Sequence, residues 1–176
     1  MYSTEIADKV MEGFLNSPKS EQIRFKRLRG LRVDDIKTED KIHFFAMFPE
    51  EVPRSRYVND VILTGLSAIA LQNGKAKGVK LYEALAEAYY DSKNPSDSFK
   101  RDIECFVQGK AEYNMTFFHD FWKLYQRLQK EKDIDIFGMV HDLIFWDDKK
   151  TKEKYVNELV FYKERKKNSR SEKEIN

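Results

Sequence analysis

Clustered cations are the residues of this sequence whose spacing most clearly indicates a chemistry. Arg24, Lys26, Arg27 and Arg29 place four positive charges in six residues with no acid between them. Most lysines and arginines of a highly charged chain only keep it soluble, but a cluster of this density is typical of a surface that attracts anions. Because arginine and lysine contact phosphate oxygens whatever the base, we expect contacts to a nucleic-acid backbone.

A second group of cations lies later in the chain, on two predicted helices. Lys100 and Arg101 stand near the start of one helix, where a positive charge opposes the helix dipole and therefore hints at an external anion. Lys123 and Arg127 are one turn apart on the next helix. No zinc finger, helix-turn-helix or aromatic RNA-binding signature accompanies them, which favours phosphate contacts over base reading. The predicted nucleic-acid-binding residues are Arg24, Lys26, Arg27, Arg29, Lys100, Arg101, Lys123 and Arg127.

The three histidines raise the question of a catalytic metal. His119 and His141 are each followed by an aspartate, and such pairs occur in helical metal-dependent phosphohydrolases. That site needs further ligands converging on one ion, and only His43, in an apolar run, is left to help. The sequence also has no HExxH, CxxC, GxGxxG or GxxxxGK[ST] pattern and no nucleophile elbow. We therefore expect a protein that is not an enzyme, with no metal and no cofactor.

Three consecutive helices between residues 96 and 146 are predicted to position the later cations. Ser96 or Ser98 caps the first helix, which ends at Gly109. The second carries apolar residues at 117, 118, 121, 122, 125 and 128, which share one broad face. Asp135 caps the third helix. Short links between these amphipathic helices indicate antiparallel neighbours in a small bundle.

The earlier cations are predicted to lie on the second of five helices in the first half of the chain. In that helix Ile23 and Leu28 should face the core, while Arg24 and Arg27 share an exposed face. The fourth helix is hydrophobic over most of its circumference, which marks a central buried helix. The first helix is expected at 4–15, and the second runs from the Ser17-Pro18 cap through Arg29. The third begins at a Thr38 cap, carries Ile42, Phe45 and Ala46, and ends before Pro49. The fourth runs from Arg54 or Ser55 to Asn73, and the fifth through 79–89.

Composition favours an all-α fold of two small helical bundles, with about eight or nine helices and no sheet. Of 176 residues only seven are glycine and four proline, too few for the many turns of a sandwich or barrel. Residues 91–95 are polar and precede a helix cap, so they are the best domain boundary. We expect a helical domain at 1–92, a helical bundle at 93–165 and a disordered basic tail at 166–176. The bundle should include a last helix that packs back on it through Tyr155, Val156, Leu159, Val160 and Tyr162.

Cysteine usage and hydropathy bear on location. Cys105 is the single cysteine, which excludes an internal disulfide, and its place in an apolar helix predicts that it is buried. The first ten residues lack a basic start and an apolar run, so no signal peptide is expected. No window reaches the roughly 18 apolar residues of a membrane span. We therefore expect a cytoplasmic protein without a membrane partner.

The order of these features resembles the CasB family, the small subunit of the type I-E CRISPR surveillance complex Cascade, over about residues 20–165. That family has an early basic helix, an apolar central helix, a helix rich in Leu and Ala, a capped helix that starts with paired cations, a helix with cations between hydrophobic residues, an Asp-led helix that ends in Trp, and a final charged helix. These are matched here by Arg24 to Arg29, Val58 to Leu71, Leu81 to Ala86, Ser98-Phe99-Lys100-Arg101, Trp122 to Leu128, Ile134 to Trp146, and Lys149 to Tyr162. Lys100 and Lys123 stand where arginine is common in the family, and the basic tail lies outside the shared pattern.

The resemblance implies an all-helical, non-enzymatic protein of two small bundles. Two copies would sit head to tail in Cascade, beside the other Cascade subunits and the guide RNA, and would hold the displaced non-target DNA strand so that the R-loop is stabilised. The alternative from another class is a helical protein-protein interaction adaptor whose cations only serve solubility. A salt titration of single-strand binding separates the two hypotheses, because phosphate contacts weaken with salt.

Overall fold

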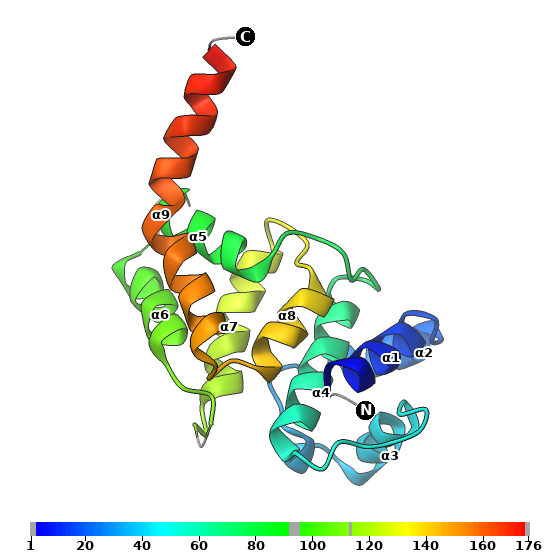
Figure 1. The fold of residues 1–176 in the computed structure, drawn as a ribbon. Coiled ribbons are helices and arrows are strands. Elements are labelled where there is room, and N and C mark those ends of the chain that lie inside the picture. Colours follow the sequence, from blue (N-terminus) through cyan, green and yellow to red (C-terminus); the bar gives the residue numbers. More distant parts are fainter. Residues whose placement is uncertain (1–2, 92–95, 113, 175–176) are drawn as a thin grey trace.

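The computed structural model describes residues 3–91, 96–112 and 114–174. In that part of the chain it has nine α-helices, one short 3-10 helix and no sheet, so the predicted all-α fold of eight or nine helices is confirmed (Figure 1). The elements are α1 (Ser3–Leu15), α2 (Lys19–Lys26), η1 (Val33–Asp35), α3 (Thr38–Ala46), α4 (Arg56–Leu71), α5 (Leu81–Asp91), α6 (Asp97–Gln108), α7 (Phe117–Gln129), α8 (Ile136–Ile144) and α9 (Lys149–Glu174).

The central position predicted for α4 is confirmed. Every residue from 58 to 70 is buried, and α1, α2 and α8 pack around the helix (Figure 1). Ser55 caps it, because its side-chain oxygen accepts a hydrogen bond from the Val58 amide. A Cβ on Gly65 would lie 2.6 Å from Val140 Cγ2 and 3.1 Å from Met11 Sδ, so glycine lets α8 and α1 approach α4 closely.

Helices from both sides of the expected boundary near residue 92 contribute to one core. The α8 helix packs on α4 and α1, and α5 packs on α9. The buried side chain of Gln72 joins the halves, accepting hydrogen bonds from the Ile134 amide at 2.7 Å and the Tyr125 hydroxyl at 2.8 Å. Residues 92–95 of the expected boundary lie outside the described residues. The division into two bundles stays a prediction about how the halves would fold alone.

The second half is held by packed aromatic rings, as the phenylalanine-rich helices predict. Trp146 is 1% exposed and lies 4.5 Å from Phe106 and 4.9 Å from Tyr155, between ring centroids. Its indole Nε1 donates to the Gly109 carbonyl at 3.1 Å. The predicted caps of α6 and α8 are confirmed, since Ser96 accepts from the Phe99 amide and Asp135 from the Gly138 amide.

The second and third helices differ from expectation in which residues they bury. Ile23 is 46% exposed, while Phe25 takes its place in the core with Leu28. This choice follows from the way α2 packs on α4, which no periodicity within eight residues specifies. The α2 helix also ends at Lys26 instead of Arg29, and Ser17 bonds back to the Phe14 carbonyl instead of capping it.

On α3 the expected apolar residues lie outward. Ile42 is 65% exposed and Phe45 37% exposed, whereas Phe44 between them is fully buried. The predicted Thr38 cap is wrong by one residue: Lys37 precedes the helix, and no side chain caps it. A polar first turn therefore located the helix approximately, while its buried face was decided by the neighbouring elements.

Cys105 and α9 give two further corrections. Cys105 is exposed, because α6 buries Phe99, Ile103, Phe106 and Val107, and residue 105 falls on the opposite side of the helix. The α9 helix continues to Glu174, so residues 166–174 are helical where a disordered tail was expected. Lysine, glutamate and arginine are good helix formers, which favours this continuation even without an apolar face. No helix of the described residues is long and apolar enough to cross a bilayer.

Candidate nucleic-acid interface

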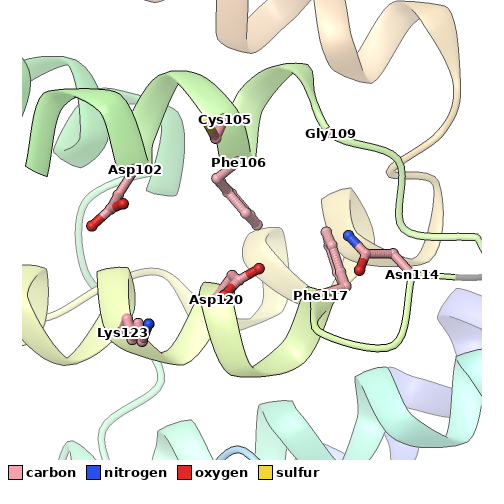
Figure 2. Close-up of a pocket in the computed structure, with 8 residues that line it drawn as sticks. All are labelled: Asp102, Cys105, Phe106, Gly109, Asn114, Phe117, Asp120 and Lys123. Carbon is pink, nitrogen blue, oxygen red and sulfur yellow. The ribbon is translucent and has the colours of Figure 1, made fainter. Parts of the chain in front are cut away.

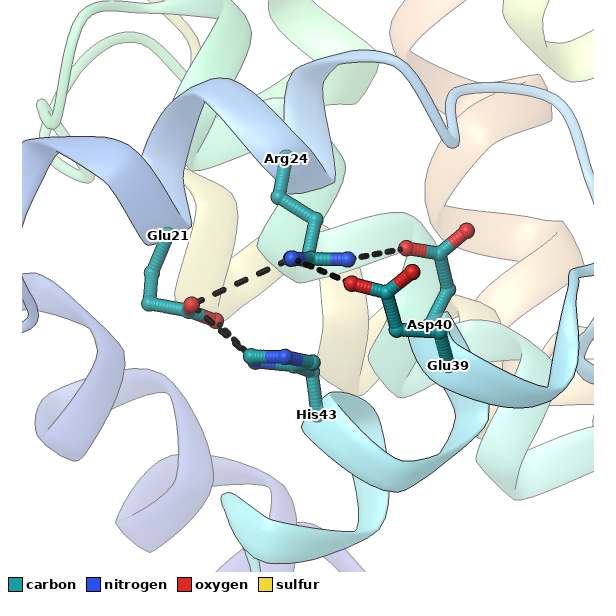
Figure 3. A network of polar contacts seen from close by, with 5 residues as sticks. All are labelled: Glu21, Arg24, Glu39, Asp40 and His43. Atoms are coloured by element: carbon teal, nitrogen blue, oxygen red, sulfur yellow. Dashed lines mark hydrogen bonds and ion pairs between the residues drawn. The ribbon is translucent and has the colours of Figure 1, made fainter.

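Arg24 is half-buried and ion-paired to α3, where the spacing predicts a fully exposed cation. Its Nη1 lies 2.8 Å from Asp40 Oδ1 and its Nη2 lies 3.0 Å from Glu39 Oε1, both on α3 (Figure 3). Glu21 is on the third side, 3.9 Å from Nε. Hydrogen bonds to Asp40 and then Glu39 raise the pKa of Arg24. Three carboxylates therefore compensate this charge, which makes Arg24 the weakest phosphate ligand of the first cluster.

The other cations of α2 and of the turn after it differ in accessibility. Arg27 is exposed and borders an open hollow of ≈700 Å³, which is also lined by apolar residues and by the carboxylates of Glu21, Asp35, Glu39 and Asp40. Arg29 is exposed and donates to the Lys26 carbonyl at 3.1 Å, while the Lys26 side chain is half-buried. Within the described residues neither Arg27 nor Arg29 forms an ion pair. These two arginines are thus the cations of the first cluster that are placed to meet an external anion.

The α6–α7 cations lie on two flanks of an antiparallel helix pair. The Arg127 guanidinium carbon lies 3.5 Å from the centroid of the Phe99 ring, and the Lys100 ammonium lies 5.5 Å from that of Tyr89. Both cations therefore contact an aromatic face and keep their charge near the surface. Arg101 is exposed and points away from the buried face of α6.

Lys123 lies in a groove between α6 and α7 that also contains acids. Figure 2 shows Asp102 on α6, with Asp120 and Lys123 on α7, around a hollow of ≈280 Å³ floored by Phe106 and Phe117. Two carboxylates beside one ammonium give this groove a net negative charge. Lys123 is therefore a weaker candidate for a phosphate contact than Arg101.

Six of the eight predicted residues lie on two surfaces, while Arg24 is ion-paired with α3 and Lys26 is half-buried. We call the exposed cations Arg27 and Arg29 the α2 surface, and Lys100, Arg101, Lys123 and Arg127 the α6–α7 surface. The helices α2 and α6 lie apart in Figure 1, but the turn after α2 that carries Arg29 reaches α7, since a Cβ on Gly30 would lie 3.3 Å from Trp122 Cδ1. The α2 surface therefore adjoins α7, the helix that carries Lys123 and Arg127.

Two cation sites escaped the sequence reasoning. Arg32 donates to the Asn114 carbonyl at 2.8 Å and lies 5.7 Å above the Phe118 ring, so it ties the chain after α2 to the start of α7. Tyrosines of α5 and α9 gather beside lysines, among them Tyr162 and Lys166. The spacing of four between Tyr162 and Lys166 could have indicated the second site from the sequence. The tyrosines of α5 that complete this site gave no such signal.

The histidines are dispersed over the fold. His43 Nδ1 lies 3.0 Å from Glu21, His141 Nε2 lies 2.7 Å from Asp8, and the exposed His119 lies 3.5 Å from Asp120. Each histidine thus has one carboxylate neighbour. Within the described residues no group of three or more metal-ligating side chains converges on one point.

Comparisons with known proteins add nothing to this geometry: no protein-family model, no curated protein and no solved structure matches the chain. Function therefore has to be inferred from the residues and their placement.

Proposed function

We propose that the protein is the non-catalytic small subunit of a type I-E CRISPR Cascade complex. In this role it binds nucleic-acid backbone without sequence specificity and stabilises the displaced non-target strand of the R-loop in antiviral defence. The observation that supports the proposal most is the pair of outer surfaces, α2 and α6–α7, whose exposed cations stand in the basic blocks that resemble CasB. Arg27, Arg29 and Arg101 are the members of those blocks with the least compensated charge.

The physical case rests on the energetics of strand exchange. Replacing a DNA duplex by an RNA–DNA heteroduplex is close to balance, so modest backbone contacts to the freed strand shift the equilibrium toward the open state. Such contacts must be independent of sequence, because any target has to be held. Cations on rigid helices, without base-reading elements, have that property. The partners of the protein in this role are the other Cascade subunits, the guide RNA, the displaced strand and a second copy of the chain.

Salt-dependent binding of single-stranded DNA tests the proposal. For the full chain, the logarithm of the affinity should fall linearly with the logarithm of salt, with a slope of about −0.7 for each phosphate neutralised. Changing Arg27→Gln together with Arg101→Gln should lower the affinity and reduce the slope, whatever the sequence of the strand. The matched control is Lys9→Gln with Arg56→Gln, which removes two cations from exposed ion pairs elsewhere and should leave both unchanged.

A protein-interaction adaptor remains the second candidate, favoured by the outward Ile42 and Phe45 on α3. Isolated exposed apolar residues are ordinary, but two on one short helix suit a partner contact. Single-strand binding that is absent at low salt, or that does not change with salt, would favour the adaptor over the Cascade subunit.

A further inference from the structure

Three tyrosines gather where α5 meets α9. The Tyr90 and Tyr162 rings are stacked, with centroids 5.6 Å apart and planes only 4° from parallel. Tyr89 meets Tyr90 edge to face at 4.9 Å. All three side chains are half-buried, so part of each ring remains accessible. We call Tyr89, Tyr90 and Tyr162 the tyrosine platform; it lies apart from the α2 surface and borders the α6–α7 surface at Lys100.

Hydrogen bonds hold two rings of the platform in place. The Tyr90 hydroxyl donates to the Leu159 carbonyl at 2.8 Å, which ties α5 to α9. The Tyr89 hydroxyl donates to Glu104 on α6, and this bond raises the pKa of Tyr89 to about 12. Tyr89 is therefore protonated at neutral pH and remains a donor. Glu104, the acid that faces the platform, already has a hydrogen-bond partner in this tyrosine.

Each ring of the platform has a lysine ammonium beside it. Lys100 lies 5.5 Å from the centroid of Tyr89, and Lys163 lies 5.1 Å from that of Tyr90. Lys166 lies 5.7 Å from the centroid of Tyr162. These cations come from two helices, α6 and α9, and give the surroundings of the rings a positive charge. Aromatic faces combined with flexible cations are the elements by which proteins hold single strands without reading their sequence.

A small apolar hollow adjoins the rings. It has a volume of ≈190 Å³ and lies between α5, α6 and α9 (Figure 1 shows the three helices side by side). Its walls are Tyr89, Tyr90, Val107, Val156, Leu159 and Val160, with Glu104 and Gln108 as polar members. Val156 and Val160 are 41% and 59% exposed, so this face of α9 is open, although the sequence predicts that both pack against the bundle.

We propose that the tyrosine platform and the adjoining hollow bind unpaired bases of a single-stranded nucleic acid. Bases stack on the tyrosine rings or enter the hollow, and Lys100, Lys163 and Lys166 contact the phosphates that flank them. A base that stacks on a ring displaces the ammonium above it toward the phosphate of the same strand, where a cation is better compensated. This site extends the proposed function, on which it rests, by adding base stacking to backbone contact.

Charge and chemistry favour this occupant over a protein side chain. An apolar peptide would need the valines but gains nothing from three surrounding ammonium groups, whereas a nucleotide uses rings, hollow and cations together. Stacking is also tolerant of sequence, because every base has a π face. The platform therefore satisfies the same requirement as the cationic surfaces, which is to hold a strand of any sequence.

Two probes of equal charge test the platform: an oligothymidylate and an abasic oligonucleotide with the same number of phosphates. The full chain should bind the oligothymidylate about ten-fold more tightly at the same salt concentration, since stacking adds to phosphate contacts. Tyr90→Leu and Tyr162→Leu keep apolar bulk but lose the π face, so they should abolish most of this preference. Tyr162→Phe should retain it. Phe161→Leu is the matched control, an exposed neighbouring aromatic outside the platform.

The outcomes separate this inference from the proposed function. Binding that depends on salt but is equal for both probes would overturn the platform and leave the backbone role intact. A preference that survives in folded Leu variants would also overturn it, and would place the stacking elsewhere. No single-strand binding by the wild-type chain would overturn both. Thermal unfolding checks the variants, and the comparison of the two probes on the wild type needs no variant at all.

Discussion

Arg24 and Arg27 are three residues apart, yet they have different neighbours. Arg24 donates to Asp40 and lies close to two further carboxylates, while the exposed Arg27 forms no ion pair within the described residues. Removing Arg24 leaves three acids facing one another between α2 and α3. Removing Arg27 takes one charge from the surface and leaves no group unpaired.

We expect Arg24→Gln to lower the free energy of unfolding and Arg27→Gln to leave it nearly unchanged. The like charges of Glu21, Glu39 and Asp40 would then repel without a cation between them. Single-strand affinity should show the reverse order, with the larger loss for Arg27→Gln. Urea unfolding and strand titration of the two variants check both orders, and equal losses of stability would contradict the ion-pair network.

Asp60 is a buried carboxylate on α4, and its ionisation lowers the stability of the folded state. It is 8% exposed and accepts a hydrogen bond from the Val33 amide at 2.8 Å. Burial raises the pKa of Asp60 above its ordinary value of 3.8, despite the opposing effect of that hydrogen bond. Because the folded state binds this proton more tightly, its contribution to stability falls as the pH rises from 3.8 through the raised pKa.

The stability of the Asp60→Asn variant relative to the wild type should therefore be greatest at neutral pH. Asparagine can accept the same amide hydrogen without a buried charge, so the variant should equal or exceed the wild type in stability near pH 7. Its advantage should shrink as acid protonates Asp60 in the wild type. Unfolding titrations of both proteins between about pH 4 and 7 measure this difference. If the stability of the two proteins changed with pH in the same way, the pKa of Asp60 would not be raised by folding.

At the scale of elements, the contact of α4 with α8 depends on Gly65. A Cβ there would meet Val140 Cγ2 at 2.6 Å, a distance that real Cβ atoms do not show. By contrast, a Cβ on Gly13 of α1 would meet nothing within 4 Å. The same substitution therefore has opposite consequences on two helices.

We expect Gly65→Ala to destabilise the protein by about 1–2 kcal/mol, because overpacking outweighs the gain in helix propensity. Gly13→Ala is the control and should stabilise it by up to about 1 kcal/mol. Denaturant unfolding of the two variants measures both signs. A stabilising Gly65→Ala would mean that α4 and α8 are packed less closely than described.

The α9 helix has a packed half and an outer half. Tyr155 is 1% exposed beside Trp146, whereas the C-terminal end of α9 extends away from the other helices (Figure 1). Truncation after Arg165 keeps Tyr155, Tyr162 and the 2.6 Å ion pair of Arg165 with Glu158. It removes helix that adds little to the core, together with the Lys166 ammonium near Tyr162.

The truncated chain should keep its fold, with a melting temperature within about 3 °C of the full chain. The affinity for both probes should fall, since one platform cation is lost, while the preference for the oligothymidylate over the abasic strand should persist, since the three rings remain. Calorimetry and the two-probe titration measure these effects. A larger fall in melting temperature would show that residues after 165 pack on the body of the protein.

At the scale of the whole molecule, the two cationic surfaces meet at α7. The turn with Arg29 and Gly30 lies against Trp122, which directly precedes Lys123. A strand held at both surfaces would have its contacts spread over several helices, which suits a long displaced strand more than a compact ligand.

Two double variants test the surfaces in a reconstituted complex: one joins Arg27→Gln to Arg29→Gln, and the other joins Arg101→Gln to Lys123→Gln. Each double variant should shorten the lifetime of the R-loop. The combined variant should shorten that lifetime more than either pair does alone. Initiation of target opening should not change, since it depends on base pairing and on the protospacer-adjacent motif. Variants that assemble normally and hold the R-loop as long as the wild type would contradict the proposed role of both surfaces.

The sequence by itself determined the features that depend on near neighbours. The helices, the caps at Ser96 and Asp135, and the burial of α4 follow from periodicity and from hydrogen bonds three residues apart. The prediction that Cys105 is buried was wrong, although the spacing of Phe99, Ile103 and Phe106 puts residue 105 on the opposite side of the helix. Such features are local, so one segment contains all the information that they need.

Only the tertiary structure decided which segments meet. Two of the three acids that neutralise Arg24 come from another helix about 15 residues away, and Tyr90 meets Tyr162 across more than seventy positions of the sequence. The exposure of Ile23 and Ile42, and the contact of the turn after α2 with Trp122 on α7, likewise depend on how helices pack in space. Many side-chain arrangements satisfy the pattern of each helix, and the packing of the others selects one of them, which is why the number of cations was predictable and their accessibility was not.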